Sequence, residues 1–325
     1  MAPILENRKA SAGYGHEIEN QIVIVTGAAG FIGSHCARHF ARRGWSVVGL
    51  DRRAAAVAAP VRLCWEAFEI DDLTDCERLC RLLDRFAPQA IIHAAGPASV
   101  EQSFRDPSAD FSAQVTPWVT LLQAIQRTSS QARLILCSSA AVYGNPRHLP
   151  VAETAERSPI SPYGYHKVVK ELLLEEYVAL HGARGSAARI FSTFGPGLRH
   201  LAVWDIARRM LVKDFRLEGT GRETRDYLYI EDVAAALLQI AVSAQHRGEA
   251  INVASGSEIE IRQLAALVGR ELGLGGVNLA GDSMTMVGKP TRWRADVAQL
   301  RGLGFSPSFS LDEGLSATLR WIKSV

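Results

Sequence analysis

The hydrophobic positions of this chain fall in short runs separated by longer stretches with helical spacing. From residue 21 onward the runs are rich in Val, Ile and Leu and are bounded by Gly, Pro or polar residues, as expected for strands buried on both faces of a sheet. Alternation of such strands with helices is typical of βαβ units and a parallel sheet. The predicted strands are Gln21–Thr26, Ser46–Asp51, Val61–Ile70, Ala90–His93, Arg133–Ser138 and Ala188–Phe191.

The alternation breaks after Gly195, where Gly and Pro cluster. Beyond that point the pattern predicts a helix over Leu201–Lys213 and a sheet-packing helix over Val233–Val242. We therefore predict an α/β fold with a Rossmann-type doubly wound parallel sheet over residues 21–194, which carries the catalytic residues. Residues 195–325 are expected to form a smaller, mainly substrate-binding region, with some segments returning to the first domain.

Composition narrows the class of protein. With 325 residues, 47% of them hydrophobic and 22% charged, the chain matches a globular protein with a substantial core. Its 36 basic and 34 acidic side chains leave a net charge of +2, too balanced to indicate nucleic acid or a membrane surface as a partner. No apolar run reaches membrane-spanning length, and residues 1–20 lack the apolar core of a signal peptide, so we expect a flexible N-terminal tail.

Cysteine usage indicates a reducing, cytoplasmic setting. The chain has five cysteines and no CxxC pair, which does not suggest a closed disulfide set. Cys76 and Cys80 are spaced four residues apart on a predicted helix, but no His or Cys partner stands at zinc-finger spacing. No metal site is therefore expected.

A glycine pattern follows the first predicted strand. Gly27, Gly30 and Gly33 end that strand and open a helix, with a GxxGxxG spacing one residue longer than GxGxxG. Gly27 permits a tight turn, Gly30 lets a pyrophosphate approach the backbone, and Gly33 allows close helix packing. Free N–H groups at the helix start, around Phe31 and Ile32, suit phosphates. This context predicts dinucleotide binding.

Acidic residues after the next strands bear on cofactor choice. Asp51 ends the second strand, where a carboxylate accepts hydrogen bonds from the adenosine ribose and repels a 2′-phosphate, which favours NAD over NADP. Arg52 and Arg53 leave the alternative that a guanidinium holds that phosphate. Asp72, after the third strand, is placed either to reach the adenine or to cap the following helix.

Polar residues suited to acid/base catalysis follow later in the chain. Ser138 and Ser139 lie at the end of a predicted strand, and Tyr163 and Lys167 enter a predicted helix. Residues i and i+4 share a helix face, so the Lys167 ammonium favours the ionised phenolate of Tyr163 and makes a base available. Such a pair is common on helices; here it follows a glycine signature and a strand-end serine, which indicates a catalytic site.

Further motifs occur in a consistent order: TGAAGFIGSH, HAAG, SSAAVYG, SPYGYHK, RIFSTFGPG and RDYLYIEDV. Together they resemble the extended short-chain dehydrogenase/reductase family, in its nucleotide-sugar epimerase and dehydratase branch, over about Gln21–Ile322. The resemblance implies that NAD is the cofactor and Tyr163 the acid/base, with Lys167 holding the nicotinamide ribose. It implies that Ser139 binds the reacting sugar hydroxyl, with Ser138 as the alternative.

The resemblance also implies contacts around that centre. Arg225 matches a position that pairs with the substrate diphosphate, a suitable use of a forked cation, although a structural contact with Asp226 is the alternative. Arg199 and His200 lie in a loop that either contacts the substrate or only caps a helix. The further implied contacts are Ala94 and Ala95 for the cofactor, and Ser99, Ala140, Tyr163 and Ser192 for the substrate.

Departures from the branch narrow the chemistry. Ala140 and Ala141 stand where the dehydratases carry an Asp-Glu pair, which argues against dehydration, and Ala141 also weakens a decarboxylase reading. Ala98 replaces a cofactor-contacting Lys of the UDP-galactose type epimerases. Ser192 and Gln114 each replace a usual Asn, so the identity of the sugar stays open.

We therefore predict an NAD-dependent nucleotide-sugar epimerase that inverts C4 through a transient 4-keto intermediate. The alternatives are an NAD(P)-dependent 4-ketosugar reductase or decarboxylase, and a non-catalytic cofactor-binding regulator. The helices near Pro107–Arg127 and Ser161–His181 resemble the pair that forms the family's dimer interface, so a homodimer is expected. Trp118, Val168 and Leu172 are candidates for that interface, or alternatively for the intramolecular core.

Overall fold

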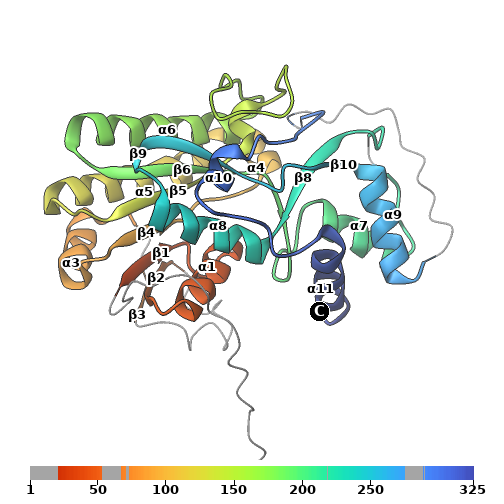
Figure 1. The fold of residues 1–325 in the computed structure, drawn as a ribbon, viewed down its shortest axis with the longest axis horizontal. Coiled ribbons are helices and arrows are strands. Elements are labelled where there is room, and N and C mark those ends of the chain that lie inside the picture. The colour runs from red at the N-terminus through yellow and green to blue at the C-terminus, as the bar shows by residue number, and fades with distance from the viewer. Residues whose placement is uncertain (1–20, 53–66, 71–72, 218, 275–287, 289) are drawn as a thin grey trace, which may run out of the picture.

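The main sheet is seven-stranded, parallel throughout, and ordered β3-β2-β1-β4-β5-β6-β9 (Figure 1). The computed structural model describes residues 21–52, 67–70, 73–217, 219–274, 288 and 290–325. The strand order reverses between β1 and β4, as in doubly wound folds, which confirms the predicted Rossmann-type architecture. The strands are β1 (Ile22–Thr26), β2 (Ser46–Asp51), β3 (Ala67–Ile70), β4 (Ala90–His93), β5 (Arg133–Ser139), β6 (Arg184–Ile190) and β9 (Arg247–Val253).

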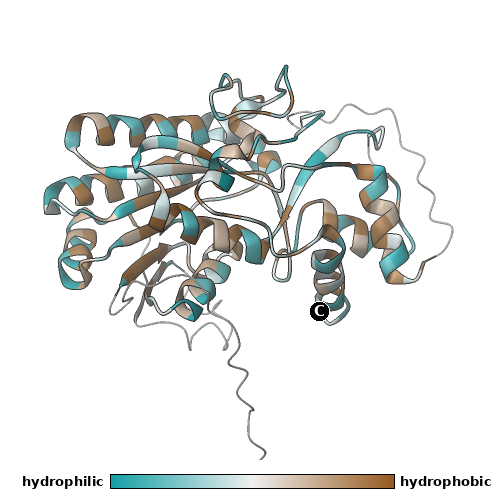
Figure 2. Ribbon diagram, in the orientation of Figure 1, coloured by the Kyte–Doolittle hydropathy of each residue, from teal (hydrophilic) through white to brown (hydrophobic). Residues whose placement is uncertain are grey.

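Helices cover both faces of this sheet (Figure 1). One face packs against α3 (Cys76–Phe86), α5 (Pro107–Thr128) and α6 (Pro162–His181), and the other against α1 (Phe31–Arg42) and α8 (Ile230–Ser243). The helices mix apolar and polar residues along their length, as helices with one side on a sheet do (Figure 2). The sheet therefore separates two hydrophobic cores.

A second, three-stranded sheet, in the order β10-β8-β7, lies beyond the main one. With its neighbouring helices it forms the right-hand part of Figure 1. Its elements are β7 (Ser192–Phe194), β8 (Thr224–Tyr229), β10 (Glu258–Glu260), α7 (Ala202–Leu211), α9 (Ile261–Leu272) and α11 (Leu311–Lys323). Two short helices, α4 (Val100–Arg105) and α10 (Ala298–Gly302), are not part of this group. Strand β9 belongs to the main sheet, and α8 packs on that sheet. The chain therefore returns to the Rossmann-type part after forming elements of the second sheet.

Three predicted boundaries were wrong. The helix predicted over Val233–Val242 is α8, which begins three residues earlier, at Ile230. The strand predicted over Ala188–Phe191 is β6, which begins four residues earlier, at Arg184. Its first half is Arg-Gly-Ser-Ala, too small and polar to be recognised as a buried run, yet all of it except Arg184 is buried between β5 and β9. The helix predicted over Leu201–Lys213 ends at Leu211. The predicted tail, residues 1–20, and most of the strand predicted over Val61–Ile70 lie outside the described residues.

Local sequence places α6 where the site needs it. Ser161 is the N-cap, its hydroxyl accepting the Gly164 N–H at 3.1 Å, and Pro162 occupies the first helical position. The helix therefore begins immediately before Tyr163. A Cβ on Gly164 would lie 2.7 Å from the Ala141 carbonyl oxygen, so only a glycine lets the first turn of α6 pack against the turn that follows β5.

Candidate active site

The glycine loop after β1 is shaped by its neighbours. Gly27 has φ +66°, and a Cβ there would lie 2.7 Å from the backbone nitrogen of Ala95 and 2.8 Å from the Ala94 carbonyl carbon. A Cβ on Gly33 would approach the Gly27 oxygen to 2.2 Å. Gly30 is the N-cap of α1 and offers no side chain to the first helical N–H groups. This backbone cradle fits a dinucleotide pyrophosphate, with Phe31 and Ile32 in the opening turn of the helix.

Asp51 lies beside this loop. Its carboxylate accepts the Ala29 N–H at 3.0 Å and is almost fully buried at the end of β2. The same contact braces the glycine loop and leaves the carboxylate at the carboxyl edge of the sheet, where the family's adenosine ribose is expected. Asp72, the second predicted acidic contact, lies outside the described residues.

The three predicted catalytic residues lie around the end of β5. The Lys167 ammonium donates to the Cys137 carbonyl at 3.1 Å, two residues before Ser139, and lies 5.4 Å from the centre of the Tyr163 ring. The Tyr163 backbone N–H donates to the buried Ser103 hydroxyl of α4 at 3.1 Å, which fixes the start of α6. Serine, phenol and ammonium are thus brought to one edge of the sheet.

The structure distinguishes the two serines. The Ser138 hydroxyl donates to the Glu171 carboxylate at 2.5 Å, inside the protein. Glu171 also binds the buried Arg189 guanidinium, whose Nη1 donates to the Tyr143 hydroxyl at 2.9 Å. Ser138 is therefore committed to a structural network, and Ser139, which is half-buried and caps the turn after β5 through the Ala141 N–H, is the serine left for a substrate.

Arg225 and Asp226 separate on β8. Asp226 is fully buried and accepts from the backbone N–H groups of Ser255, Gly256 and Ala295, so it is a structural residue. The Arg225 guanidinium donates to the Thr224 carbonyl and lies 5.5 Å above the Trp293 ring. Burial lowers the pKa of Arg225. The alternative of an Arg225–Asp226 pair is not what the structure shows, and Arg225 is suited to an anion.

The remaining predicted substrate contacts lie on different elements. Ser99 caps α4 by accepting the Gln102 N–H at 3.1 Å, while Ala140 is buried in the turn after β5 and Ser192 is half-buried at the start of β7. Arg199 lies over the Trp321 ring of α11 at 5.9 Å. His200 is exposed in the same loop, and partial desolvation lowers its pKa.

The sequence analysis did not predict the contacts that join α1 to α8 and to the loop after β7. The His35 imidazole of α1 lies 2.9 Å from the Glu231 carboxylate of α8 and 3.0 Å from the Pro196 carbonyl. The hydrogen bond from His35 lowers the pKa of Glu231. His35 and Glu231 both stand in motifs quoted for the family, but 196 positions separate them, and no local pattern indicates that they meet.

A fully buried lysine was also missed. Lys170 lies one turn after Lys167 on α6, and its Nζ has no hydrogen-bond partner among the described residues. Its backbone carbonyl accepts the Trp118 indole N–H at 3.0 Å, and its Nζ lies 5.9 Å from that ring. Burial, and then the charge of Lys167, lower the pKa of Lys170. The position of Lys170 in the sequence of the helix is one that a surface lysine could equally occupy, so its burial could not be predicted.

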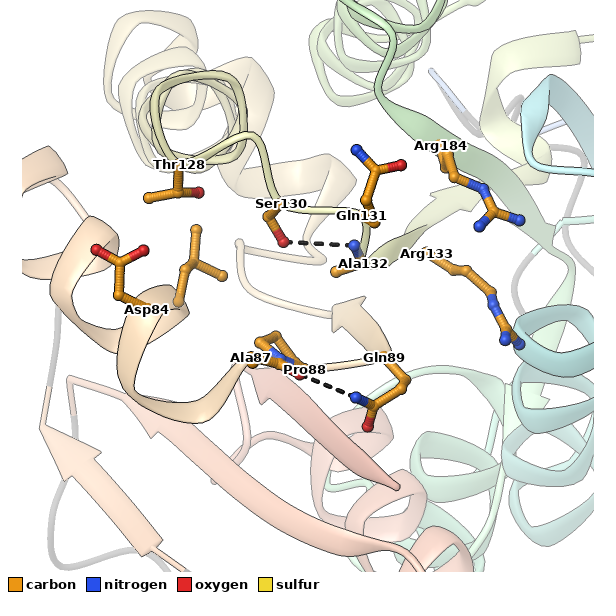
Figure 3. A pocket seen from close by; sticks show the side chains of 11 residues that line it. Asp84, Ala87, Pro88, Gln89, Thr128, Ser130, Gln131, Ala132, Arg133 and Arg184 are labelled. Atoms are coloured by element: carbon orange, nitrogen blue, oxygen red, sulfur yellow. Dashed lines mark hydrogen bonds between the residues drawn. The ribbon is translucent and has the colours of Figure 1, made fainter. Parts of the chain in front are cut away.

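A cavity of about 480 Å³ lies away from this site. It is lined by residues such as Asp84, Ser130, Arg133 and Arg184, at the edge where β5 and β6 begin (Figure 3). Ser139 stands at the opposite edge, where β5 ends. Within the described ranges no cluster of three or more His, Cys, Asp or Glu residues could hold a metal, and no helix there is long and apolar enough to cross a membrane.

Comparison with known proteins agrees with this geometry. The profile of the NAD dependent epimerase/dehydratase family matches residues 23–254, well over half of the chain, so the chain belongs to that family. The match contains the glycine loop and the predicted catalytic residues. It confirms the family assigned from the motifs, and with it the prediction of NAD as cofactor.

Individual relatives are similar over almost their whole length. A putative UDP-glucose 4-epimerase of Methanocaldococcus jannaschii is 27% identical over 93% of this chain and 99% of its own. The UDP-glucose 4-epimerase of Thermotoga maritima, solved with UDP-glucose, superposes with a TM-score of 0.85 at 26% identity, covering 94% and 99% of the two chains. The Thermus thermophilus UDP-glucose 4-epimerase, solved with NAD, gives 0.82 at 28% identity, covering 94% and 100%.

Proposed function

We propose that this protein is an NAD-dependent nucleotide-sugar 4-epimerase that acts on UDP-hexoses of the glucose and galactose type. The observation that carries the proposal is that α6 places Tyr163 and Lys167 beside the end of β5, the strand that ends at Ser139. The Thermotoga and Thermus epimerases were solved with UDP-glucose and with NAD, respectively, which supports both the nucleotide and the cofactor.

The chain's own residues divide the reaction between them. Tyr163, as phenolate, takes the proton of the sugar O4 hydroxyl, and Ser139 hydrogen-bonds that oxygen. NAD, held by the glycine loop and Lys167, would supply the hydride acceptor that C4 oxidation requires and the hydride donor for its reduction. Lys167, whose ammonium lies 5.4 Å from the centre of the Tyr163 ring, holds the nicotinamide ribose. Arg225 retains the diphosphate while the 4-keto sugar turns its other face to the site, and reprotonation by Tyr163 completes the inversion.

The turn after β5 argues for epimerisation over elimination. Removing water across the ring needs an additional acid and base beside the catalytic hydroxyl, but Ala140 is fully buried and Ala141 carries no titratable group. A 4-ketosugar reductase with the same residues is the remaining enzymatic alternative. It would consume one NAD(P)H per turnover, whereas an epimerase leaves the cofactor unchanged.

An NMR screen separates these functions. Purified protein is incubated with UDP-glucose, UDP-galactose and related nucleotide sugars, with a trace of NAD, and the anomeric proton signals are followed. The proposal predicts a new anomeric signal and no accumulation of NADH. Reduction of an added nucleotide 4-ketosugar with consumption of one NAD(P)H per turnover would support the reductase, and no conversion of any sugar would leave the non-catalytic regulator.

We further propose a homodimer built on α5 and α6. These helices lie side by side at one end of the molecule (Figure 1). Phe111, Tyr165, Leu172 and Leu180 are exposed on them, with Leu180 at 73%. Trp118, by contrast, is fully buried in the core and cannot contribute.

The setting of the enzyme is also proposed. The four described cysteines are free thiols, which suits the reducing cytoplasm. A net charge of +2 gives no reason to expect nucleic acid or a membrane as partner. We also keep the division of the chain into a cofactor-binding part, residues 21–194, and a mainly substrate-binding part, residues 195–325, which carries Arg225.

A further inference from the structure

Trp293 lies where the C-terminal part of the chain passes the catalytic turn. Its backbone N–H donates to the Thr224 carbonyl at 3.2 Å, and the Thr224 N–H donates to Thr291 at 3.0 Å. The segment therefore runs beside the residue that precedes Arg225. The half-buried Trp293 ring packs edge-on against Phe191, with ring centres 5.8 Å apart, so its orientation is fixed from a second side.

The indole N–H of Trp293 reaches the turn that follows Ser139. It donates to the Gly144 carbonyl at 3.0 Å. Gly144 closes the turn Ala140–Tyr143, has φ +58°, and a Cβ there would lie 2.1 Å from the Ser158 oxygen. Gly144 is confined by Ser158 on one side and accepts a hydrogen bond from Trp293 on the other. The turn that follows Ser139 is therefore fixed by both residues.

The face of the same indole carries Arg225. The guanidinium carbon lies 5.5 Å from the ring centre, a distance at which a cation is attracted to the ring. Burial lowers the pKa of Arg225, and the charge of Glu223 offsets this only in part. Contact with a ring face does not use the in-plane N–H groups of a guanidinium, so those other than the Nη1 group that donates to Thr224 can bind phosphate oxygens.

We propose that Trp293 is a positioning residue with two separable tasks: its ring face orients Arg225 toward the substrate diphosphate, and its N–H holds the turn that presents Ser139. The inference rests on the proposed function, because it takes the anion bound by Arg225 to be a nucleoside diphosphate. Its two tasks use different atoms of one side chain, so substitutions can remove them one at a time.

The test compares Trp293→Phe, which keeps an aromatic face and removes the N–H, with Trp293→Leu, which removes both. UDP binding is measured by calorimetry with NAD present, and kcat with UDP-glucose. Trp293→Phe should keep UDP affinity within about threefold and lower kcat about three- to tenfold, the effect of one lost hydrogen bond. Trp293→Leu should also weaken UDP binding about tenfold, through lost stacking. Phe86→Leu is the control, since Phe86 carries Arg85 at 4.6 Å far from the site.

Each other outcome overturns the inference. If Trp293→Phe weakens UDP binding as much as Trp293→Leu, the two tasks are not separable. If either variant loses NAD binding, Trp293 is a general core residue, and unchanged UDP affinity and kcat in both variants would show that it positions nothing. A wild-type protein that turns over no UDP-sugar would contradict the proposed function itself, whereas normal wild-type turnover with unaffected variants contradicts this inference alone.

Discussion

Tyr163 carries the proton chemistry of the proposed reaction. Replacing it with Phe deletes the phenolic oxygen and keeps the ring. We expect kcat to fall by about a hundred- to ten-thousand-fold, toward the upper end, because Ala140 and Ala141 offer no substitute base. NAD and UDP affinity should change little.

The matched control is Tyr165→Phe, two residues further on the same helix, where the side chain is 59% exposed. Its kcat should equal that of the wild type. Retention of most activity by Tyr163→Phe would move the base elsewhere, with His166, which is 2.5 Å from the Asp110 carboxylate, as the nearest candidate.

Asp51 is the residue expected to set the choice between NAD and NADP. We expect the unmodified protein to bind NAD more tightly than NADP, because a buried carboxylate at the ribose repels a 2′-phosphate. Asp51→Ala should weaken NAD by about tenfold, the value of one or two charge-assisted hydrogen bonds, and so narrow the gap. Fluorescence titration of both cofactors measures this, with the exposed Asp84→Ala as control. Equal affinities in the wild type would refute it.

At the scale of single elements, α6 shows what the sequence could and could not predict. Its start and the spacing of Tyr163 and Lys167 are local features, so neighbouring residues suffice to predict that both enter one helix. The partners of α6 were not predicted, because they depend on α5, β5 and β6 packing against it. Thus Lys170, at an ordinary helical position, is buried against Trp118, and the first half of β6 was missed for the same reason.

Burial of Lys170 gives α6 a pH-dependent cost. In the unfolded chain this lysine is protonated below its ordinary pKa of about 10.4, whereas burial and the charge of Lys167 lower its pKa in the folded protein. The fold therefore loses stability as pH falls from that value toward neutrality. Lys170→Met should raise Tm by about 2–4 °C or more at pH 7 and by less at pH 10.

Thermal unfolding at both pH values measures this, with the exposed Lys213→Met as control. The change in Tm that this variant causes, relative to the wild type, should be the same at both pH values. A Tm of Lys170→Met below that of the wild type at pH 7 would mean that the buried amine stabilises the fold, which contradicts the prediction.

At the scale of the whole molecule, the exposed apolar side chains of α5 and α6 predict assembly. Light scattering should give twice the mass of the 35.4 kDa chain. Leu172→Glu combined with Leu180→Glu places charges at residues that are 47% and 73% exposed and should yield monomers. Val212→Glu, on a residue that is 65% exposed after α7, is the control and should stay dimeric. A monomeric wild type would contradict the assembly.

The proposed site combines Ser139 from the main sheet with Arg225 from the second sheet. The central claim for this site is that hydride leaves C4 of the sugar and returns to it. UDP-glucose deuterated at C4 is incubated with the wild-type protein and a trace of NAD in ordinary water, and the product is examined by NMR. Transient oxidation at C4 predicts UDP-galactose that keeps its deuterium at C4, without net formation of NADH. A product that has exchanged this deuterium for solvent hydrogen would contradict the claim.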